Sequence, residues 1–156
     1  MGLDEIVSLP VADVTEDNCA LFFWSVWPRL FDAKTVIDAW GFSYRTLAFV
    51  WVKLNKNSMG LFTGMGYYGR ANTEPCLLAV RGRMPVEAHD VLSVIMSPIR
   101  EHSQKPSEQY DKIERLYPNG NYLELFARNT RPNWTSIGHG IDGKDIRVSL
   151  LELAES

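Results

Sequence analysis

The sequence predicts one α/β domain over residues 1–156, in which helices cover a doubly wound sheet. Short, continuously apolar runs typical of buried strands alternate with segments whose apolar residues recur at helical spacing. Polar and charged residues cluster at 100–105 and 128–130, as they do at the carboxyl edge of an α/β sheet, where ligands bind. Repeats, low-complexity tracts and linkers are not apparent, so the length fits a single domain.

The first half of the chain predicts a strand–helix–strand unit. Residues 19–26 are continuously apolar with three aromatic residues, which indicates a buried strand. Pro28 is typical of a first helical turn, and Gly41 is typical of a helix end. The apolar residues between them recur at helical spacing: Leu30, Ala33, Ile37 and Trp40. The next strand is expected at 46–52, which completes a βαβ unit.

The second half predicts strands at 75–80 and 91–96, joined by a hairpin connection or an exposed excursion over 81–90. A helix is expected from Pro106, with one apolar stripe formed by Tyr110, Ile113, Leu116 and Tyr117. Residues 122–127 read as the last convincing strand, and 150–155 as a short helical tail.

Residues 55–72 form a long glycine-rich connection, with glycines at 60, 64, 66 and 69. Residues 64–69 formally fit Gly-x-Gly-x-x-Gly, but no helical pattern follows, so a dinucleotide site is rejected. Tyr67 and Tyr68 lie between these glycines and suit stacking on an unpaired base. On spacing alone, packing of both rings in the core is an alternative at least as well supported as stacking.

The charge balance is uneven along the chain. The net charge is −3, yet residues 53–105 carry seven Lys and Arg against four Asp and Glu, which makes them the only net-basic third. A solvated face or a phosphate-contacting patch would explain this excess. Cys19 and Cys76 adjoin strand-like runs and read as reduced thiols, which fits a cytoplasmic protein. The histidines show no metal-like spacing, and no apolar run is long enough to span a membrane, so neither is expected.

Three side chains stand out near the predicted sheet edge. Lys105, just before a helix, reads most simply as a solvated surface lysine. Glu124 lies inside an apolar strand, where a buried carboxylate needs a partner or a ligand. Arg128 follows at the strand end. A structural salt bridge between these two residues and a site for ligand hydroxyls are equal alternatives.

Seven blocks of residues, in order over about 3–143, resemble one family closely. They are Leu-Phe-Phe-Trp at 21–24, Ala-Trp-Gly-Phe at 39–42, Trp-Val-Lys at 51–53, Gly-Met-Gly-Tyr-Tyr at 64–68, Glu74, Arg-Glu-His-Ser-Gln-Lys-Pro at 100–106 and Glu-Leu-Phe-Ala-Arg at 124–128. The sequence is similar to the MT-A family of N6-adenine methyltransferases, which methylate adenine in RNA or DNA. The resemblance implies a Rossmann-like methyltransferase fold with permuted motif order.

The resemblance also implies S-adenosyl-L-methionine as cofactor. By match of motif, Lys105 would hold its carboxylate end. The ribose would be lined by Glu124, Arg128, Asn129 and Thr130. His139 falls where relatives usually have Asn, near the adenine end, and so departs from the family pattern.

On the substrate side, the resemblance implies a nucleic-acid partner, with DNA expected ahead of RNA. Glu74 and the loop of Tyr67 and Tyr68 would border the target adenine. Three basic candidates are assigned to the same side, namely Arg70, Arg100 and His102.

The family's catalytic Asp-Pro-Pro-Trp tetrapeptide occurs nowhere in the 156 residues, so no catalytic residue is assigned. In such enzymes the Asp and a Pro carbonyl accept the hydrogens of the adenine amine, while an aromatic ring stacks on the flipped base. Residues 3–11 resemble the segment just after the tetrapeptide, so the fold is expected to lack one or more N-terminal strands.

Two interpretations follow from this absence. The first is a methyltransferase domain that is catalytically impaired by itself and exposes unpaired strand edges that favour homo- or hetero-oligomers. The alternative is a non-catalytic nucleic-acid-binding or scaffold subunit of a heterodimeric methyltransferase. A scaffold subunit would be expected to keep the strand even with an altered tetrapeptide, which favours the first interpretation.

Overall fold

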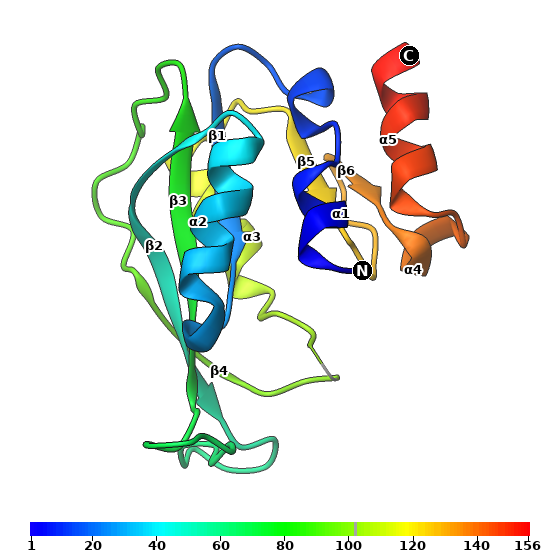
Figure 1. Ribbon diagram of the computed structural model, residues 1–156. Coiled ribbons are helices and arrows are strands. Elements are labelled where there is room, and N and C mark those ends of the chain that lie inside the picture. The colour runs from blue at the N-terminus through cyan, green and yellow to red at the C-terminus, as the bar shows by residue number, and fades with distance from the viewer. Residues whose placement is uncertain (102) are drawn as a thin grey trace.

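The computed structural model describes residues 1–101 and 103–156. It is an α/β structure, as predicted, with strands in two groups (Figure 1). The strands are β1 (Cys19–Trp24), β2 (Ser43–Leu54), β3 (Thr73–Arg81), β4 (Val94–Pro98), β5 (Tyr122–Leu125) and β6 (Trp134–Ile137). The α-helices are α1 (Leu3–Val7), α2 (Leu30–Ala39), α3 (Glu108–Leu116), α4 (His139–Asp142) and α5 (Ile146–Glu155). Short 3-10 helices cover Val11–Val14 and Trp27–Arg29.

Four strands form a mixed sheet in the order β1-β3-β2-β4. Because β3 is antiparallel to both β1 and β2, those two strands run in the same direction, and α2 connects them. The predicted strand–helix–strand unit is therefore confirmed, with β3 inserted between its two strands. The expectation of a buried first strand is wrong, because β1 lies at the sheet edge and all six of its residues are half-buried.

The helix prediction for the first unit is confirmed closely. Pro28 lies in the 3-10 turn that leads into α2, and Gly41 follows the helix with a φ of 87°, a conformation that glycine adopts without strain.

The 81–90 segment is an exposed excursion rather than a hairpin connection, because β4 pairs in parallel with β2 and not with β3.

The second sheet consists of β5 and β6 in parallel. The expectation that 122–127 holds the last strand is wrong, because β6 follows at Trp134–Ile137. The strand β5 is also shorter than predicted and ends at Leu125, since Phe126 has a φ of 58° that turns the chain out of the sheet. The C-terminal helix is longer than the predicted tail, and Asp145 caps it by accepting a hydrogen bond from the Arg147 backbone amide.

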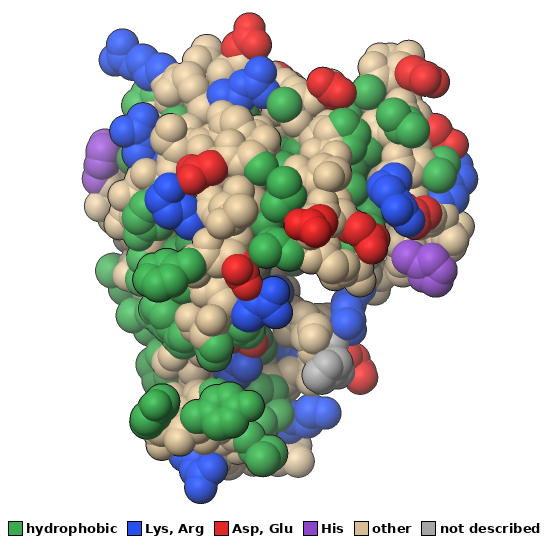
Figure 2. All heavy atoms as spheres, viewed as in Figure 1, with side chains coloured by type: hydrophobic (Ala, Val, Ile, Leu, Met, Phe, Trp, Pro, Cys, Tyr) green, Lys and Arg blue, Asp and Glu red, His purple; other side chains and the backbone are tan. Residues whose placement is uncertain are grey.

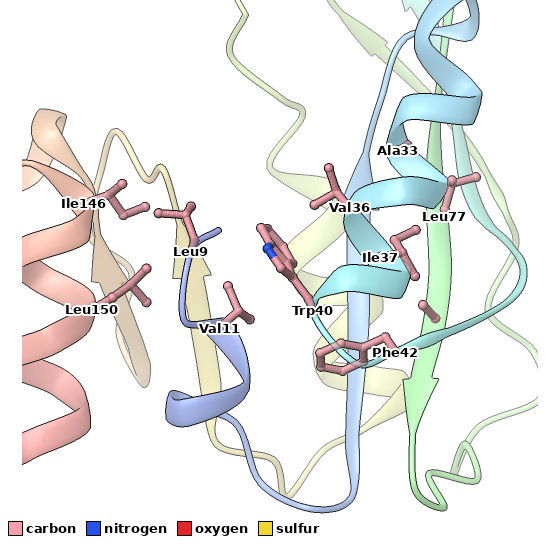
Figure 3. Packing of buried hydrophobic residues seen from close by; sticks show 11 residues of the cluster. Leu9, Val11, Ala33, Val36, Ile37, Trp40, Phe42, Leu77, Ile146 and Leu150 are labelled. Atoms are coloured by element: carbon pink, nitrogen blue, oxygen red, sulfur yellow. The ribbon is translucent and has the colours of Figure 1, made fainter. Parts of the chain in front are cut away.

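One hydrophobic cluster runs from the four-stranded sheet and α2, through Leu9 and Val11, to Ile146 and Leu150 of α5 (Figure 3). The apolar face of α2 contributes Ala33, Val36 and Ile37, which pack against Leu77 of β3. The indole nitrogen of the buried Trp40 donates a hydrogen bond to the Ile6 carbonyl at 2.9 Å and so fixes α1 against this layer.

A second cluster lies on the opposite face of the same sheet, where Ile113 of α3 packs with Phe49, Trp51, Cys76 and Ile95. Helices therefore cover both faces, as the doubly wound pattern predicts. Both cysteines are free: Cys76 is buried and Cys19 is half-buried. Over the part of the chain that is described, no helix is long and apolar enough to cross a membrane.

Replacing Ile37 by Ala should lower the free energy of unfolding by about 2–5 kcal/mol, because a fully buried side chain leaves a cavity. Phe31, 86% exposed on the same helix, is the matched control, and its replacement by Ala should change stability by less than about 0.5 kcal/mol. Urea unfolding followed by far-ultraviolet circular dichroism measures both. Equal losses in the two variants would contradict the assignment of the α2 face.

Candidate functional site

The carboxyl ends of β5 and β6 surround an open hollow of about 430 Å³. It is lined by Phe126, Ala127, Arg128, His139 and Gly140. Gly138 allows the segments after β5 and β6 to approach each other closely. A Cβ at this position would lie only 3.0 Å from the Ala127 backbone nitrogen and oxygen, so a larger residue would push the two segments apart. The bare backbone of Gly138 thus allows the start of α4 to approach the segment after β5, which places His139 and Arg128 at one hollow.

The turn at Phe126 shapes this hollow. A positive φ is uncommon for an aromatic residue, and here it leaves the Phe126 ring 49% exposed beside the hollow while Ala127 is buried. Arg128, Asn129 and Thr130 follow as exposed residues. Phe126 is not recognisable as a site residue from sequence alone, because an aromatic residue at the end of an apolar strand reads as core.

Glu124 has a partner, but not the predicted one. Its Oε2 accepts a hydrogen bond of 2.7 Å from the hydroxyl of Tyr110, on α3. Among the described residues no ion pair joins Glu124 to Arg128, so the salt-bridge alternative is wrong. Burial raises the pKa of Glu124, and the Tyr110 hydrogen bond opposes this only in part. Burial, followed by this carboxylate, raises the pKa of Tyr110, so the hydroxyl keeps its proton.

Tyr110 is held in place from two sides. Its ring meets the Trp134 ring edge to face at 5.1 Å, and the Arg131 guanidinium lies 4.9 Å from its centroid. Glu114 accepts hydrogen bonds from both of these partners, at 2.6 Å from the Trp134 indole and 3.1 Å from Arg131. This network fixes α3 against β5 and β6. From sequence, Tyr110 was only a member of an apolar helical stripe.

A second group of polar residues lies around Glu74, at the start of β3. Glu74 is 8% exposed and its two carboxylate oxygens are paired separately. Lys53 lies 2.6 Å from Oε1, and Lys105 lies 2.8 Å from Oε2. The interpretation of Lys105 as a solvated surface lysine is therefore wrong. Lys53 was noted only within a family block, and nothing in its sequence context indicated this contact.

The aromatic faces of the sheet complete this group. The Lys53 ammonium lies 5.2 Å from the Trp51 ring centroid, and the Lys105 ammonium lies 5.9 Å from that of Trp24. Burial raises the pKa of Glu74, but the hydrogen bonds and charges of Lys105 and Lys53 outweigh it, so the pKa lies below its ordinary value. Glu74 is therefore ionised at neutral pH.

The remaining predicted residues form no ion pair with Glu74 in the part of the chain that the structure describes. Tyr67 and Tyr68 are fully exposed on the loop that extends from β2 and β3 at the bottom of Figure 1, so the alternative of core packing is wrong. Figure 2 shows hydrophobic and basic side chains gathered at this end of the molecule. Arg70 and Arg100 are exposed, and His102 lies outside the described residues. Within 1–101 and 103–156, no group of His, Cys, Asp and Glu residues could hold a metal ion.

The fold and the hollow define an α/β protein with exposed polar groups after the carboxyl ends of two parallel strands, which is where α/β sheets commonly bind ligands. The MT-A70 family model matches residues 1–140. The chain belongs to the MT-A70 family, which confirms the predicted resemblance.

Three relatives show the range of this similarity. The type II methyltransferase M.MunI of Mycoplasma sp is 32% identical over 150 residues, which cover 95% of this chain and 61% of that protein. The N(6)-adenosine-methyltransferase catalytic subunit METTL3 of Homo sapiens is 34% identical over 135 residues, covering 83% of this chain and 23% of that protein. The N(6)-adenosine-methyltransferase MT-A70-like protein of Arabidopsis thaliana is 32% identical over 146 residues, which cover 92% of this chain and 21% of that protein. The chain thus spans less than two thirds of each relative.

Because the folded pKa of Glu124 is raised, the folded state binds a proton that the unfolded state has already released. This contribution to stability is full below the unfolded pKa and is lost as pH rises through the folded pKa. Replacing Glu124 by Gln should remove this pH-dependent contribution to stability. Urea unfolding between about pH 4 and pH 7 measures the change.

Tyr110→Phe should shift the loss of stability to higher pH, because the Tyr110 hydrogen bond lowers the pKa of Glu124. A Glu124→Gln variant with the wild-type pH dependence would show that the carboxylate is not desolvated.

Proposed function

We propose that these 156 residues form one domain that holds S-adenosyl-L-methionine and borders the target base of an adenine-N6 methyltransferase. The observation that carries the proposal is the arrangement at the ends of β5 and β6. Arg128, which matches the cofactor motif, and His139, which departs from it, follow β5 and β6 respectively and line one hollow, and Glu124 lies in the strand that leads to it. Methyltransferases of the MT-A70 family use this cofactor as methyl donor.

The residues present fit the cofactor chemically. Tyr110 occupies Oε2 of Glu124, which leaves Oε1 as an acceptor for a ribose hydroxyl. Arg128, Asn129 and Thr130 follow as exposed polar groups on the ribose side, and the exposed Phe126 ring offers an apolar face for adenine. His139 would lie near the adenine as a departure from the family pattern. Lys105 would hold the carboxylate, and the sulfonium of the bound cofactor would supply the methyl group.

The loop between β2 and β3 is the proposed contact with nucleic acid. Tyr67 and Tyr68 project fully into solvent, and Arg70 follows them with a positive charge. Exposed aromatic rings beside cations suit stacking on unpaired bases and contact with the sugar–phosphate backbone. Arg100 and Glu74 are assigned to the target side by the same family match. We place DNA ahead of RNA, because the type II methyltransferase is the one of the three named relatives whose length the chain covers most fully.

Catalysis requires the Asp-Pro-Pro-Trp segment, which the 156 residues do not contain. The strand β1 ends the four-stranded sheet, and β5 has one paired neighbour. In Figure 1, β5 lies on the side of β6 that faces the larger sheet. We infer that the strand bearing the tetrapeptide pairs between β1 and β5, which gives the permuted motif order. The 156-residue polypeptide by itself is then catalytically impaired and prone to association through its open strand edges.

Replacing Arg128 by Ala should weaken binding of S-adenosylhomocysteine by about tenfold or more, since a polar contact to the ligand is lost. Arg45, exposed on β2 away from the hollow, is the matched control, and Arg45→Ala should keep the wild-type affinity. Isothermal titration calorimetry measures both. Equal affinity in the two variants would place the cofactor elsewhere.

Tritiated methyl transfer to an adenine-containing oligonucleotide should stay at background for the 156-residue polypeptide, because the groups that accept the amine hydrogens are missing. Restored transfer on adding a polypeptide that carries the Asp-Pro-Pro-Trp strand would support the proposed pairing. Robust transfer by the 156 residues alone would contradict the assignment of catalysis to that segment.

Replacing Tyr67 and Tyr68 together by Ala should weaken binding of single-stranded DNA by about 1–3 kcal/mol for each lost stacking contact. Fluorescence anisotropy of a labelled oligonucleotide measures the affinity. Both rings are fully exposed, so the melting temperature should not change. Phe31→Ala removes an exposed ring on α2 and serves as the control. Unchanged DNA affinity in the double variant would remove the loop from the substrate site.

A further inference from the structure

The group around Glu74 contains one carboxylate and two ammonium groups from three separate segments. Glu74 comes from β3, where it is paired in register with Trp51 of β2. Lys53 comes from the same end of β2, and Lys105 from the segment before α3. Their side chains are 11%, 17% and 27% exposed respectively, so all three charges are largely removed from water.

The charges in this group do not balance. Glu74 is ionised, since its pKa lies below the ordinary value, and it contributes one negative charge against two positive charges. Among the described residues, Lys53 and Lys105 form ion pairs with Glu74 alone. The neighbouring thiol of Cys76 adds no charge, because burial raises its pKa. An uncompensated positive charge in a half-buried position is costly, and an incoming anion removes that cost.

The excess charge depends on Lys53. Without Lys53, Glu74 and Lys105 would form a closed neutral pair, and the Lys105 ammonium would have less attraction for a second anion. With Lys53 on Oε1, the charge of Glu74 is shared between two lysines. Lys105 is the more exposed of the two, at 27% against 17%, and is therefore the ammonium that an incoming ligand reaches.

We propose that Lys53 is a positioning residue that neutralises Glu74 and so leaves the charge of Lys105 available to the carboxylate of the cofactor. The inference rests on the proposed function and extends it, because it assigns selectivity for the amino-acid end of the cofactor to a residue that does not touch the cofactor. We therefore expect the net charge of Glu74, Lys53 and Lys105 together, and not the Lys53 side chain as such, to set the selectivity for the amino-acid end of the cofactor.

Isothermal titration calorimetry with two probes tests the proposal. S-adenosylhomocysteine carries the amino-acid carboxylate, and 5′-methylthioadenosine lacks it. The wild-type chain should prefer the first probe. Lys53→Met should reduce affinity for S-adenosylhomocysteine by about tenfold and leave 5′-methylthioadenosine unchanged, since the group becomes neutral. Lys34→Met, at an exposed ion pair on α2, is the control and should behave as wild type.

Two further variants separate charge from structure. Lys53→Met combined with Glu74→Gln returns the group to one positive charge and should recover most of the lost preference. Lys53→Arg keeps the positive charge and should retain the preference for S-adenosylhomocysteine. This variant tests the proposal if Lys53→Met fails to fold.

Several results would overturn the inference. It is wrong if Lys53→Met keeps the wild-type preference, or if the double variant folds with a wild-type melting temperature yet recovers nothing. A wild-type chain that binds both probes equally would sink the inference while leaving the cofactor site standing. A wild-type chain that binds neither probe would overturn the proposed function together with it.

Discussion

The buried carboxylate of Glu74 is the constraint on which the arrangement of the rest depends. A carboxylate at that depth must be paired, and its two lysines come from β2 and from the segment that leads into α3. Pairing with Lys105 therefore ties the segment before α3 to the start of β3. Ile113 of the same helix packs on the four-stranded sheet, while Tyr110 contacts β5 and β6. One helix thus contacts both sheets, and the segment just before it is ion-paired with Glu74.

In the proposed function, two kinds of recognition are separated along α3. Before the helix, the excess positive charge around Lys105 suits an anionic group. On the helix, Tyr110 holds one oxygen of Glu124 and leaves the other for hydroxyl groups. A molecule with a carboxylate at one end and a ribose at the other matches both. The hydroxyl of Tyr110 donates to Glu124 without adding charge, so the acceptor character of that carboxylate is preserved.

Much of the fold could be predicted from local patterns. Helix α2 and its end at Gly41 followed from apolar spacing and one glycine, and the first four strands from apolar runs. The strand β6 was missed because its four residues, preceded by Pro132 and Asn133, give too short a pattern. The site was only partly predictable, since Tyr110 and Glu124 meet across 14 residues and Lys105 and Glu74 across 31. Such contacts depend on packing between elements, whereas family motifs identified Lys105, Glu124 and Arg128 individually.

A crystal structure of the chain with S-adenosylhomocysteine is the most direct test of the proposed cofactor site. We expect the ribose hydroxyls on the free oxygen of Glu124, the adenine ring beside Phe126 and His139, and the carboxylate on Lys105, with Lys53 still bound to Glu74. A ligand seated away from the ends of β5 and β6, or one whose carboxylate faces solvent while Lys105 remains on Glu74 alone, would contradict it.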